Sequence, residues 1–183
     1  MARLIHLNGP PGIGKSTVAR RYVEQRPGVL NCDVDVLRSL VGGWRSDFIG
    51  TGRLVRPAAL ALIEAYLHES GDVVLPQMLL PLQELELFEA AAYRAGAAFV
   101  TIMLLDDRDR VVRRFRRRGY ADPDPWHDQV RAIVDDEGGD SRLLECYDAL
   151  MRLRERRSDT MVVRSTEADV DGTCRAVAAV LGS

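Results

Sequence analysis

The residue types and spacing that suggest chemistry begin at Gly9, in the stretch NGPPGIGKST. From Gly9 to Ser16 the order Gly-x-x-x-x-Gly-Lys-Ser matches the pattern of a phosphate-binding loop. Glycines let the backbone bend there so that successive N–H groups point inward at an anion. Lys15 is the only lysine in the chain. We expect its compact ammonium to enter this loop, because the wide guanidinium of arginine would not fit.

Each residue of this motif has an expected contact with ATP and Mg²⁺, the two cofactors that we predict. Lys15 is expected to bind the β- and γ-phosphate oxygens, and Ser16 to ligate the Mg²⁺ that bridges them. Thr17 is expected to reach the α-phosphate. The remaining phosphate contacts are expected from the loop residues Gly9, Pro11, Gly12, Ile13 and Gly14. The alternative is a glycine–proline turn that links a strand to a helix and fits the pattern by chance.

The elements that must position this loop alternate between strands and helices. Apolar runs predict strands at residues 3–8, 28–35, 72–80, 97–105 and 160–165. Helical composition with glycine or proline stops predicts helices at 16–26, 36–42, 57–70, 82–96, 107–118, 126–136, 141–157 and 169–181. Residues 44–53, rich in glycine and short polar side chains, are expected to form a mobile loop. This order favours one α/β domain over residues 1–183, with a parallel sheet covered by helices on both faces.

The composition restricts the class of protein. A net charge of −2 over 183 residues argues against a protein that coats nucleic acid or an anionic membrane. No apolar run reaches the roughly 20 residues that span a bilayer, and the N-terminus has no signal-peptide pattern. Cys32, Cys146 and Cys174 lack metal-site spacing, which favours reduced thiols in the cytoplasm. We therefore expect a small-molecule partner, no membrane, and a monomer or homodimer.

With the loop placed, the sequence resembles the small P-loop kinases, which include adenylate, shikimate and gluconate kinases and chloramphenicol phosphotransferase-like enzymes. The resemblance lies in the order of strands and helices, the arginine-rich helix after the fourth strand and the loop after the fifth. It implies a P-loop NTPase fold with a five-stranded sheet of order 2-3-1-4-5 and a small helical lid at about 114–136. It also implies an ATP- and Mg²⁺-dependent kinase that phosphorylates a hydroxyl of a small molecule, either an antibiotic or a metabolite.

The segment that follows the second strand carries the implied catalytic carboxylate. Residues 34–37, VDVL, resemble the V-D-x-L segment of chloramphenicol phosphotransferase-like enzymes, in which the aspartate takes the proton of the acceptor hydroxyl. This resemblance implies that Asp35 is the general base, although the choice between Asp33 and Asp35 stays open, and we expect the neighbouring Asp33 to hold Mg²⁺ through water. Two neighbouring carboxylates raise the pKa of one of them, which suits a base. The alternative is that Asp35 caps the following helix. Arg38, one turn later, either binds an anionic acceptor group or is solvated.

The third strand departs from the usual pattern. Many P-loop NTPases end this strand with a Mg²⁺-binding acid, whereas Pro76 and Gln77 stand here. The adenylate kinase motif G-F-P-R is also missing, which disfavours a nucleoside monophosphate acceptor, and the proline resembles tunicamycin-resistance-type proteins. Gln77 either binds a neutral polar acceptor or meets water at the strand end. Trp44 and Phe48 either line a pocket for a bulky, partly apolar acceptor or pack on the domain.

The arginine-rich helix and its surroundings are expected to serve the nucleotide. In the resembled kinases, arginines from this helix and the lid close over ATP and stabilise charge on the transferred group. This implies that Arg114 and Arg117 are catalytic and that Arg118 binds the nucleotide. Ser165 and Thr166, in the loop after the fifth strand, are expected at the edge of the adenine.

Three points remain open after this reading. Asp106 and Asp107 either cap the arginine-rich helix, as we expect, or supply a Mg²⁺ ligand. The arginines suggest a polynucleotide or nucleotide kinase as one alternative function, although Val111, Val112 and Phe115 form an apolar stripe that predicts packing on the domain. An NTP-binding regulatory ATPase without an acceptor is the other alternative.

Overall fold

The structure, a computed structural model, describes residues 1–69, 71–118 and 124–182. It contains a parallel sheet of five strands in the order β2-β3-β1-β4-β5. The bounds of the strands are β1 Arg3–Asn8, β2 Leu30–Asn31, β3 Val73–Leu75, β4 Ala98–Leu105 and β5 Met161–Arg164. The P-loop NTPase fold and the strand order that the sequence predicts are therefore confirmed.

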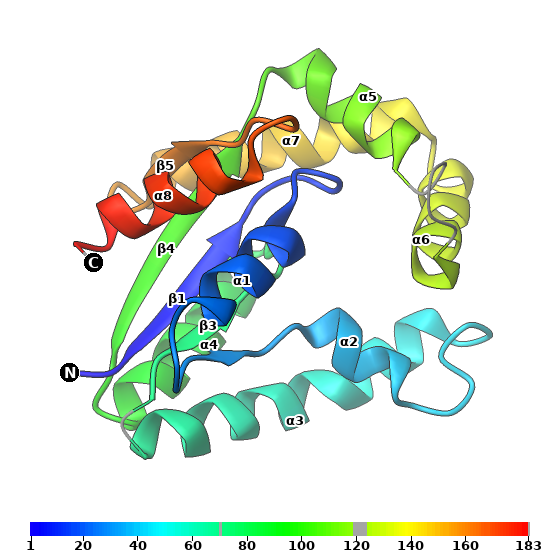
Figure 1. The fold of residues 1–183 in the computed structure, drawn as a ribbon. Helices are drawn as coiled ribbons and strands as arrows, with labels where there is room; N and C mark the ends of the chain where they lie inside the picture. Colours follow the sequence, from blue (N-terminus) through cyan, green and yellow to red (C-terminus); the bar gives the residue numbers. More distant parts are fainter. Residues whose placement is uncertain (70, 119–123, 183) are drawn as a thin grey trace.

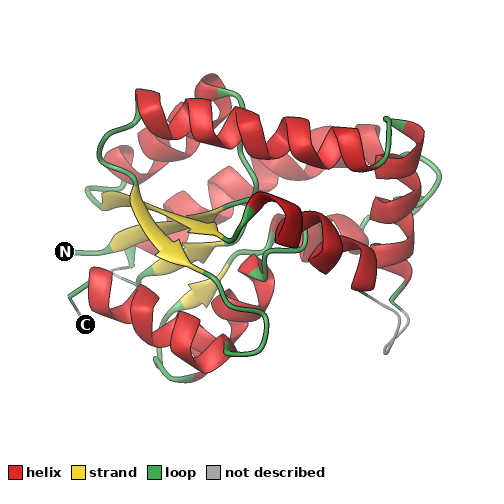
Figure 2. Cartoon of the chain, turned by 90° about the horizontal axis from the view of Figure 1, so that it is seen from above, coloured by secondary structure: helices red, strands yellow, loops and turns green. Residues whose placement is uncertain are grey.

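Helices cover both faces of the sheet (Figures 1 and 2). Their bounds are α1 Lys15–Glu24, α2 Val34–Ser39, α3 Phe48–His68, α4 Leu82–Arg94, α5 Arg108–Arg117, α6 Pro125–Asp136, α7 Asp140–Arg156 and α8 Val170–Val180. Among the described residues, none of these helices is long and apolar enough to cross a bilayer.

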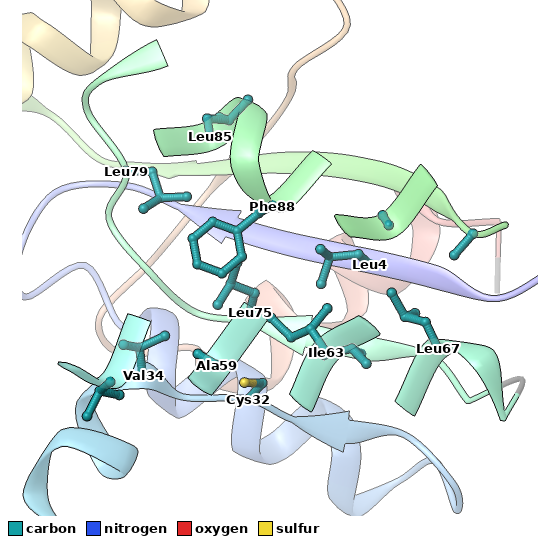
Figure 3. Packing of buried hydrophobic residues seen from close by; sticks show 14 of the residues in the cluster. Leu4, Cys32, Val34, Ala59, Ile63, Leu67, Leu75, Leu79, Leu85 and Phe88 are labelled. Atoms are coloured by element: carbon teal, nitrogen blue, oxygen red, sulfur yellow. The ribbon is translucent and has the colours of Figure 1, made fainter. Parts of the chain in front are cut away.

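Alternation along the central strand divides the core into two layers. Leu4 of β1 packs with residues of α3 and α4, including Ile63 and Phe88 (Figure 3). Ile5 and Leu7 point to the other face, against α1 and α8. Full burial of a large apolar side chain contributes about 1.5–3 kcal/mol. These two layers therefore hold the central strand, and with it the loop at its carboxyl end, in a fixed position.

Helix α3 differs from the sequence prediction. Residues 48–53 belong to this helix instead of a loop, and Pro57 lies inside the helix instead of at its start. Asp47 caps the helix, because its carboxylate accepts a hydrogen bond of 2.8 Å from the backbone N–H of Gly50. A Cβ on Gly52 would lie 2.9 Å from a guanidinium nitrogen of Arg38, so a larger residue there would have to displace the end of the Arg38 side chain. Gly50 and Gly52, which suggested a loop, therefore lie in the first turns of α3, and the N–H of Gly50 is part of the helix cap.

The second strand is also shorter than predicted. It covers only Leu30–Asn31, and α2 begins at Val34, inside the segment predicted as strand. The predicted helices at 126–136 and 141–157 correspond closely to α6 and α7. The predicted lid at 114–136 begins inside α5, and its residues 119–123 lie outside the described residues. The three cysteines are buried free thiols, as expected.

Candidate active site

The loop between β1 and α1 uses three glycines with positive φ angles, at Gly9 (145°), Gly12 (79°) and Gly14 (99°). A Cβ on Gly9 would lie 2.5 Å from the carbonyl oxygen of Leu104, and one on Gly12 would lie 2.9 Å from Cα of Phe115. A Cβ on Gly14 would meet no atom closer than 3.6 Å. The first two glycines therefore allow the loop to approach β4 and α5, in addition to the role at the phosphates that the motif predicts.

The start of α1 is arranged to receive an anion. Gly14 at the N-cap offers no side chain to the first N–H groups of the helix, and the first turn has no acidic residue. The ammonium of Lys15 donates to the carbonyl oxygens of Gly9 (2.9 Å) and Pro10 (3.1 Å). Burial lowers the pKa of Lys15 to about 8, and the nearby carboxylate of Asp35 opposes this shift. Uncapped N–H groups, a helix dipole and a poorly hydrated ammonium together fit a polyphosphate.

A cavity of about 210 Å³ lies beside this loop and is called the loop cavity below. It is bordered by the loop, by α1, by the end of α5 and by the segment that follows β5. The lining includes nine of the residues predicted to serve the nucleotide: Gly12, Ile13, Gly14, Thr17, Arg114, Arg117, Arg118, Ser165 and Thr166. Sequence reasoning missed Glu167, Val170 and Thr173, which also line it.

Arg114 connects the walls of the loop cavity. Its side chain is buried and donates to the carbonyl oxygens of Ile13 (2.8 Å) and Ser165 (2.7 Å) and to the carboxylate of Asp106 (3.2 Å). These contacts favour a role in positioning the loop, which differs from the catalytic role predicted for this arginine. The carboxylate of Asp106 accepts from Arg114 and from the N–H of Asp107 (2.8 Å). Neither aspartate makes the predicted side-chain cap of α5.

The two following arginines have different surroundings. Arg117 is exposed and forms an ion pair with Glu167 across the loop cavity. Arg118 ends α5, and its carbonyl oxygen accepts a hydrogen bond of 2.6 Å from Arg131 of α6. The positive charge of Arg118 also acts on the carboxylate of Asp35. Arg118 therefore links the nucleotide side of the protein to the predicted acceptor side.

The two aspartates after β2 differ in their roles: Asp33 caps α2, and Asp35 has a raised pKa. Asp33 is the N-cap of α2, and its carboxylate accepts a hydrogen bond of 3.1 Å from the N–H of Asp35. The capping role considered for Asp35 thus belongs to Asp33. Burial, reinforced by the negative charge of Asp33, raises the pKa of Asp35 to about 6. The charges of Arg38, Lys15 and Arg118 oppose this shift, so all three act on the Asp35 carboxylate.

The donor set for Mg²⁺ is small. Within the described ranges, no group of three or more His, Cys, Asp or Glu side chains is arranged to hold a metal ion. Mg²⁺ at nucleotide sites takes most of its ligands from phosphates and water and one or two from the protein. Ser16 in the first turn of α1 and Asp33, which uses one carboxylate oxygen for its cap, fit that share.

The predicted acceptor residues Arg38, Trp44 and Phe48 lie together. The guanidinium carbon of Arg38 is 4.1 Å from the centroid of the Phe48 ring, and Arg38 is only 7% exposed. Trp126, from the start of α6, packs on both aromatic rings, with centroid distances of 5.2 Å to Trp44 and 5.2 Å to Phe48. Sequence reasoning missed Trp126, although its position in the predicted lid was a signal. Trp44, Phe48 and Trp126 are called the aromatic cluster below.

Gln77 follows β3, at the same edge of the sheet. Its backbone carbonyl accepts a hydrogen bond of 2.8 Å from Nε2 of His6, which burial keeps neutral by lowering its pKa to about 4. The side-chain oxygen of Gln77 is buried without a hydrogen-bond partner among the described residues. A buried acceptor of this kind is satisfied by a neutral donor. His6 is fully buried.

Comparisons with known proteins agree with this architecture. The model of a family described as AAA domain matches residues 4–136. The tunicamycin resistance protein of Deinococcus radiodurans is 19% identical, with a TM-score of 0.61 over 100% of this chain and 96% of that one. A gluconokinase from Sinorhizobium meliloti 1021 is also 19% identical, with a TM-score of 0.58 over 97% and 91% of the two chains. No curated relative matches the sequence significantly. The resemblance to the small P-loop kinases is thus confirmed for the fold.

Proposed function

We propose that this chain, which belongs to the AAA domain family whose model matches residues 4–136, is an ATP- and Mg²⁺-dependent kinase that phosphorylates a hydroxyl of a small molecule. The observation that carries this proposal is the environment of Asp35. Its carboxylate is partly buried, has a pKa raised to about 6, and interacts with the charges of Lys15 and Arg118. With that pKa, the Asp35 carboxylate is largely ionised at pH 7 but accepts a proton more readily than an ordinary aspartate. A base poised near neutral pH beside a phosphate-binding loop suits phosphoryl transfer to an alcohol.

In this proposal, the phosphates of ATP lie against the N–H groups at the start of α1, and Lys15 turns its donors from the loop carbonyls to the β- and γ-oxygens. Ser16 and, through water, Asp33 would hold Mg²⁺, which would supply positive charge to the phosphates. Asp35 takes the proton of the acceptor hydroxyl while the oxygen of that hydroxyl forms a bond to the γ-phosphorus. The bond from that phosphorus to the oxygen bridging to the β-phosphate breaks, and ADP leaves.

The surrounding side chains suggest which acceptor is used. Arg117 and Arg118 border the loop cavity, and we assign them to stabilise charge on the transferred group. On the other side, the aromatic rings of Trp44 and Phe48 favour an acceptor with a flat or apolar part. The unpaired oxygen of Gln77 favours a neutral donor on the same molecule. We therefore infer that the acceptor is a hydroxyl-bearing antibiotic or metabolite that is partly apolar.

The alternative of a polynucleotide substrate has less support. Three arginines of α5 form ion pairs with acidic residues of the α5 N-cap, of α6 and of α7. These arginines are Arg108, Arg110 and Arg116. Their charge is already compensated within the protein, so the helix does not offer a strong phosphate-binding stripe. A regulatory ATPase without an acceptor remains an outcome of the experiment below.

The experiment is a screen for ADP release against a library of hydroxyl-bearing compounds, including antibiotics. We expect at least one compound to stimulate ADP release and to gain a phosphate by mass spectrometry. In Asp35→Asn, which keeps the shape of the side chain, we expect unchanged ADP affinity and a transfer rate about 10²–10⁴-fold lower. Full transfer by Asp35→Asn would overturn the assignment of the base. ATP hydrolysis that no compound stimulates would favour the regulatory ATPase.

A further inference from the structure

The aromatic cluster joins the lid helix to the acceptor side. Trp126 lies in the first turn of α6, where its backbone N–H donates to the carboxylate of Asp124 (2.8 Å). Its ring is in contact with Trp44, from the segment after α2, and with Phe48, the first residue of α3. Figure 1 shows α6 facing the α2–α3 end of the molecule across the open side of the fold. The lid helix therefore contacts the acceptor residues directly.

Arg38 lies beneath these rings. Its guanidinium carbon is 4.1 Å from the ring centroid of Phe48 and 5.5 Å from that of Trp126. The Nε atom of Arg38 is buried and makes no hydrogen bond within the described part of the chain. A buried donor without an acceptor destabilises the protein unless a ligand satisfies it. The aromatic cluster thus covers Arg38, whose Nε–H can donate a hydrogen bond to a ligand.

The nucleotide side is arranged differently. The loop cavity is lined by the phosphate-binding loop, α1, the end of α5 and the segment after β5, and its lining includes neither Arg38 nor any ring of the aromatic cluster. A nucleotide can therefore enter the loop cavity while the rings stay in contact. A flat group that stacks between Trp126 and Phe48, over Arg38, must first separate the two rings, because centroids 5.2 Å apart leave no room for a third ring between them.

We propose that Trp126 belongs to the acceptor site and that α6 forms the wall of this site that moves when the acceptor enters, whereas nucleotide binding leaves it in place. This inference rests on the proposed function for the identity of the acceptor side. It makes Trp126 a positioning residue: its ring packs on the flat or apolar part of the acceptor and holds it next to Asp35. The acceptor class it implies is a compound with a flat or apolar group close to its reactive hydroxyl.

Fluorescence can test the movement without a known acceptor. Trp44 and Trp126 are the only tryptophans in the chain, so in Trp44→Phe, Trp126 is the sole source of tryptophan fluorescence, excited at a wavelength that tyrosine does not absorb. We expect ADP with Mg²⁺ to bind, as measured by calorimetry, without changing the emission or the acrylamide quenching of Trp126. Compounds from the hydroxyl library that bind should change both. A large change in the quenching of Trp126 on binding ADP alone would overturn the proposal.

Substitution at Trp126 provides the second test, with Trp126→Phe as the matched aromatic control. In Trp126→Ala, we expect hydrogen exchange of the α6 amides to become about tenfold faster, and the affinity for ADP to stay unchanged. For an acceptor found in the screen, its KM should rise about tenfold while the KM for ATP is unchanged. Trp126→Phe should keep α6 hydrogen exchange and the acceptor KM close to those of the original protein. Tyr93→Ala, which removes an exposed ring of α4, should leave both quantities unchanged.

These outcomes separate the inference from the proposed function. If no compound is phosphorylated, the proposed function fails, whereas the quenching and hydrogen-exchange measurements still report whether Trp126 holds α6. If transfer occurs but Trp126→Ala leaves both α6 exchange and the acceptor KM unchanged, the inference is wrong and the proposed function stands. Equal losses of ADP and acceptor affinity would also contradict it, because they would make Trp126 part of the nucleotide site.

Discussion

Asp35 and Lys15 carry opposite charges, and their pKa values shift for the same reason. Burial disfavours the charged form of each side chain, which raises the pKa of Asp35 to about 6 and lowers that of Lys15 to about 8. Their mutual attraction opposes both shifts. Both groups therefore remain largely charged at neutral pH, although each is easier to neutralise than on a surface. This is the condition that a proton acceptor beside a phosphate site requires.

The shift at Asp35 predicts a pH-dependent gain of stability in Asp35→Asn. The ordinary pKa of an aspartate side chain is 3.8, and that of Asp35 is about 6 in the folded protein, so the folded state binds more protons between these values. Stability contributed by Asp35 therefore falls as pH rises from about 4 to 6, and the penalty persists above 6. We expect Asp35→Asn to raise the free energy of unfolding by about 1–2 kcal/mol at pH 7 and hardly at pH 4. Urea denaturation at both pH values measures this, and equal effects at the two pH values would contradict it.

At the scale of elements, Arg114 of α5 connects segments that are distant in the sequence. It holds the carbonyl of Ile13 in the phosphate-binding loop and the carbonyl of Ser165 after β5. The hydroxyl of Ser165 donates to the same Ile13 carbonyl (2.8 Å). Hydrogen bonds from a charged donor are roughly twice as strong as neutral ones. The helix thus fixes the loop whose N–H groups are expected to bind phosphate.

This network predicts a large difference between neighbouring arginines. Arg114→Ala removes the buried guanidinium that pairs with the Asp106 carboxylate and donates to the carbonyls of Ile13 and Ser165, so we expect a loss of about 3–5 kcal/mol in the free energy of unfolding. Arg117→Ala removes an exposed ion pair with Glu167, and we expect a loss below about 1 kcal/mol. Guanidinium denaturation of both variants makes the comparison. Similar losses in the two would show that the buried contacts of Arg114 do not hold the loop.

Across the whole molecule, the site forms because all five strands run in the same direction. The carboxyl end of β1 leads into the phosphate-binding loop, and that of β2 leads to Asp33 and Asp35. Gln77 follows β3, and Ser165 follows β5. Parallel strands bring these ends to one edge of the sheet, where ligands of open α/β sheets bind. The two apolar layers on either side of β1 keep that edge in place.

Ligand binding at this edge should stabilise the whole fold. A ligand present at 100 times its dissociation constant adds about 2.7 kcal/mol to the stability of the folded state. For a chain of 183 residues, this corresponds to a rise of roughly 5–10 °C in Tm. We expect ADP with Mg²⁺ to produce such a rise in differential scanning fluorimetry, and Lys15→Ala to abolish it. An equal rise in Lys15→Ala would locate nucleotide binding away from the phosphate-binding loop.

Features that depend only on residues close together in the sequence were predictable from the sequence. The spacing from Gly9 to Ser16 indicated the phosphate-binding loop, and apolar runs indicated the strands around it. The resemblance to small P-loop kinases added the strand order. The start of α3 was not predicted in this way, because the glycines and short polar residues at 44–53 suggest a loop, whereas Asp47 caps a helix there.

The sequence alone determined the motif, the α/β class and the pair of aspartates after the second strand, because these depend on local spacing and periodicity. Only the tertiary structure decided that Asp33 caps α2, that Arg114 is bound to the loop, and that Trp126 covers Arg38. Each of these side chains has several possible partners. Which partner it contacts depends on how folding brings together segments that are far apart in the sequence.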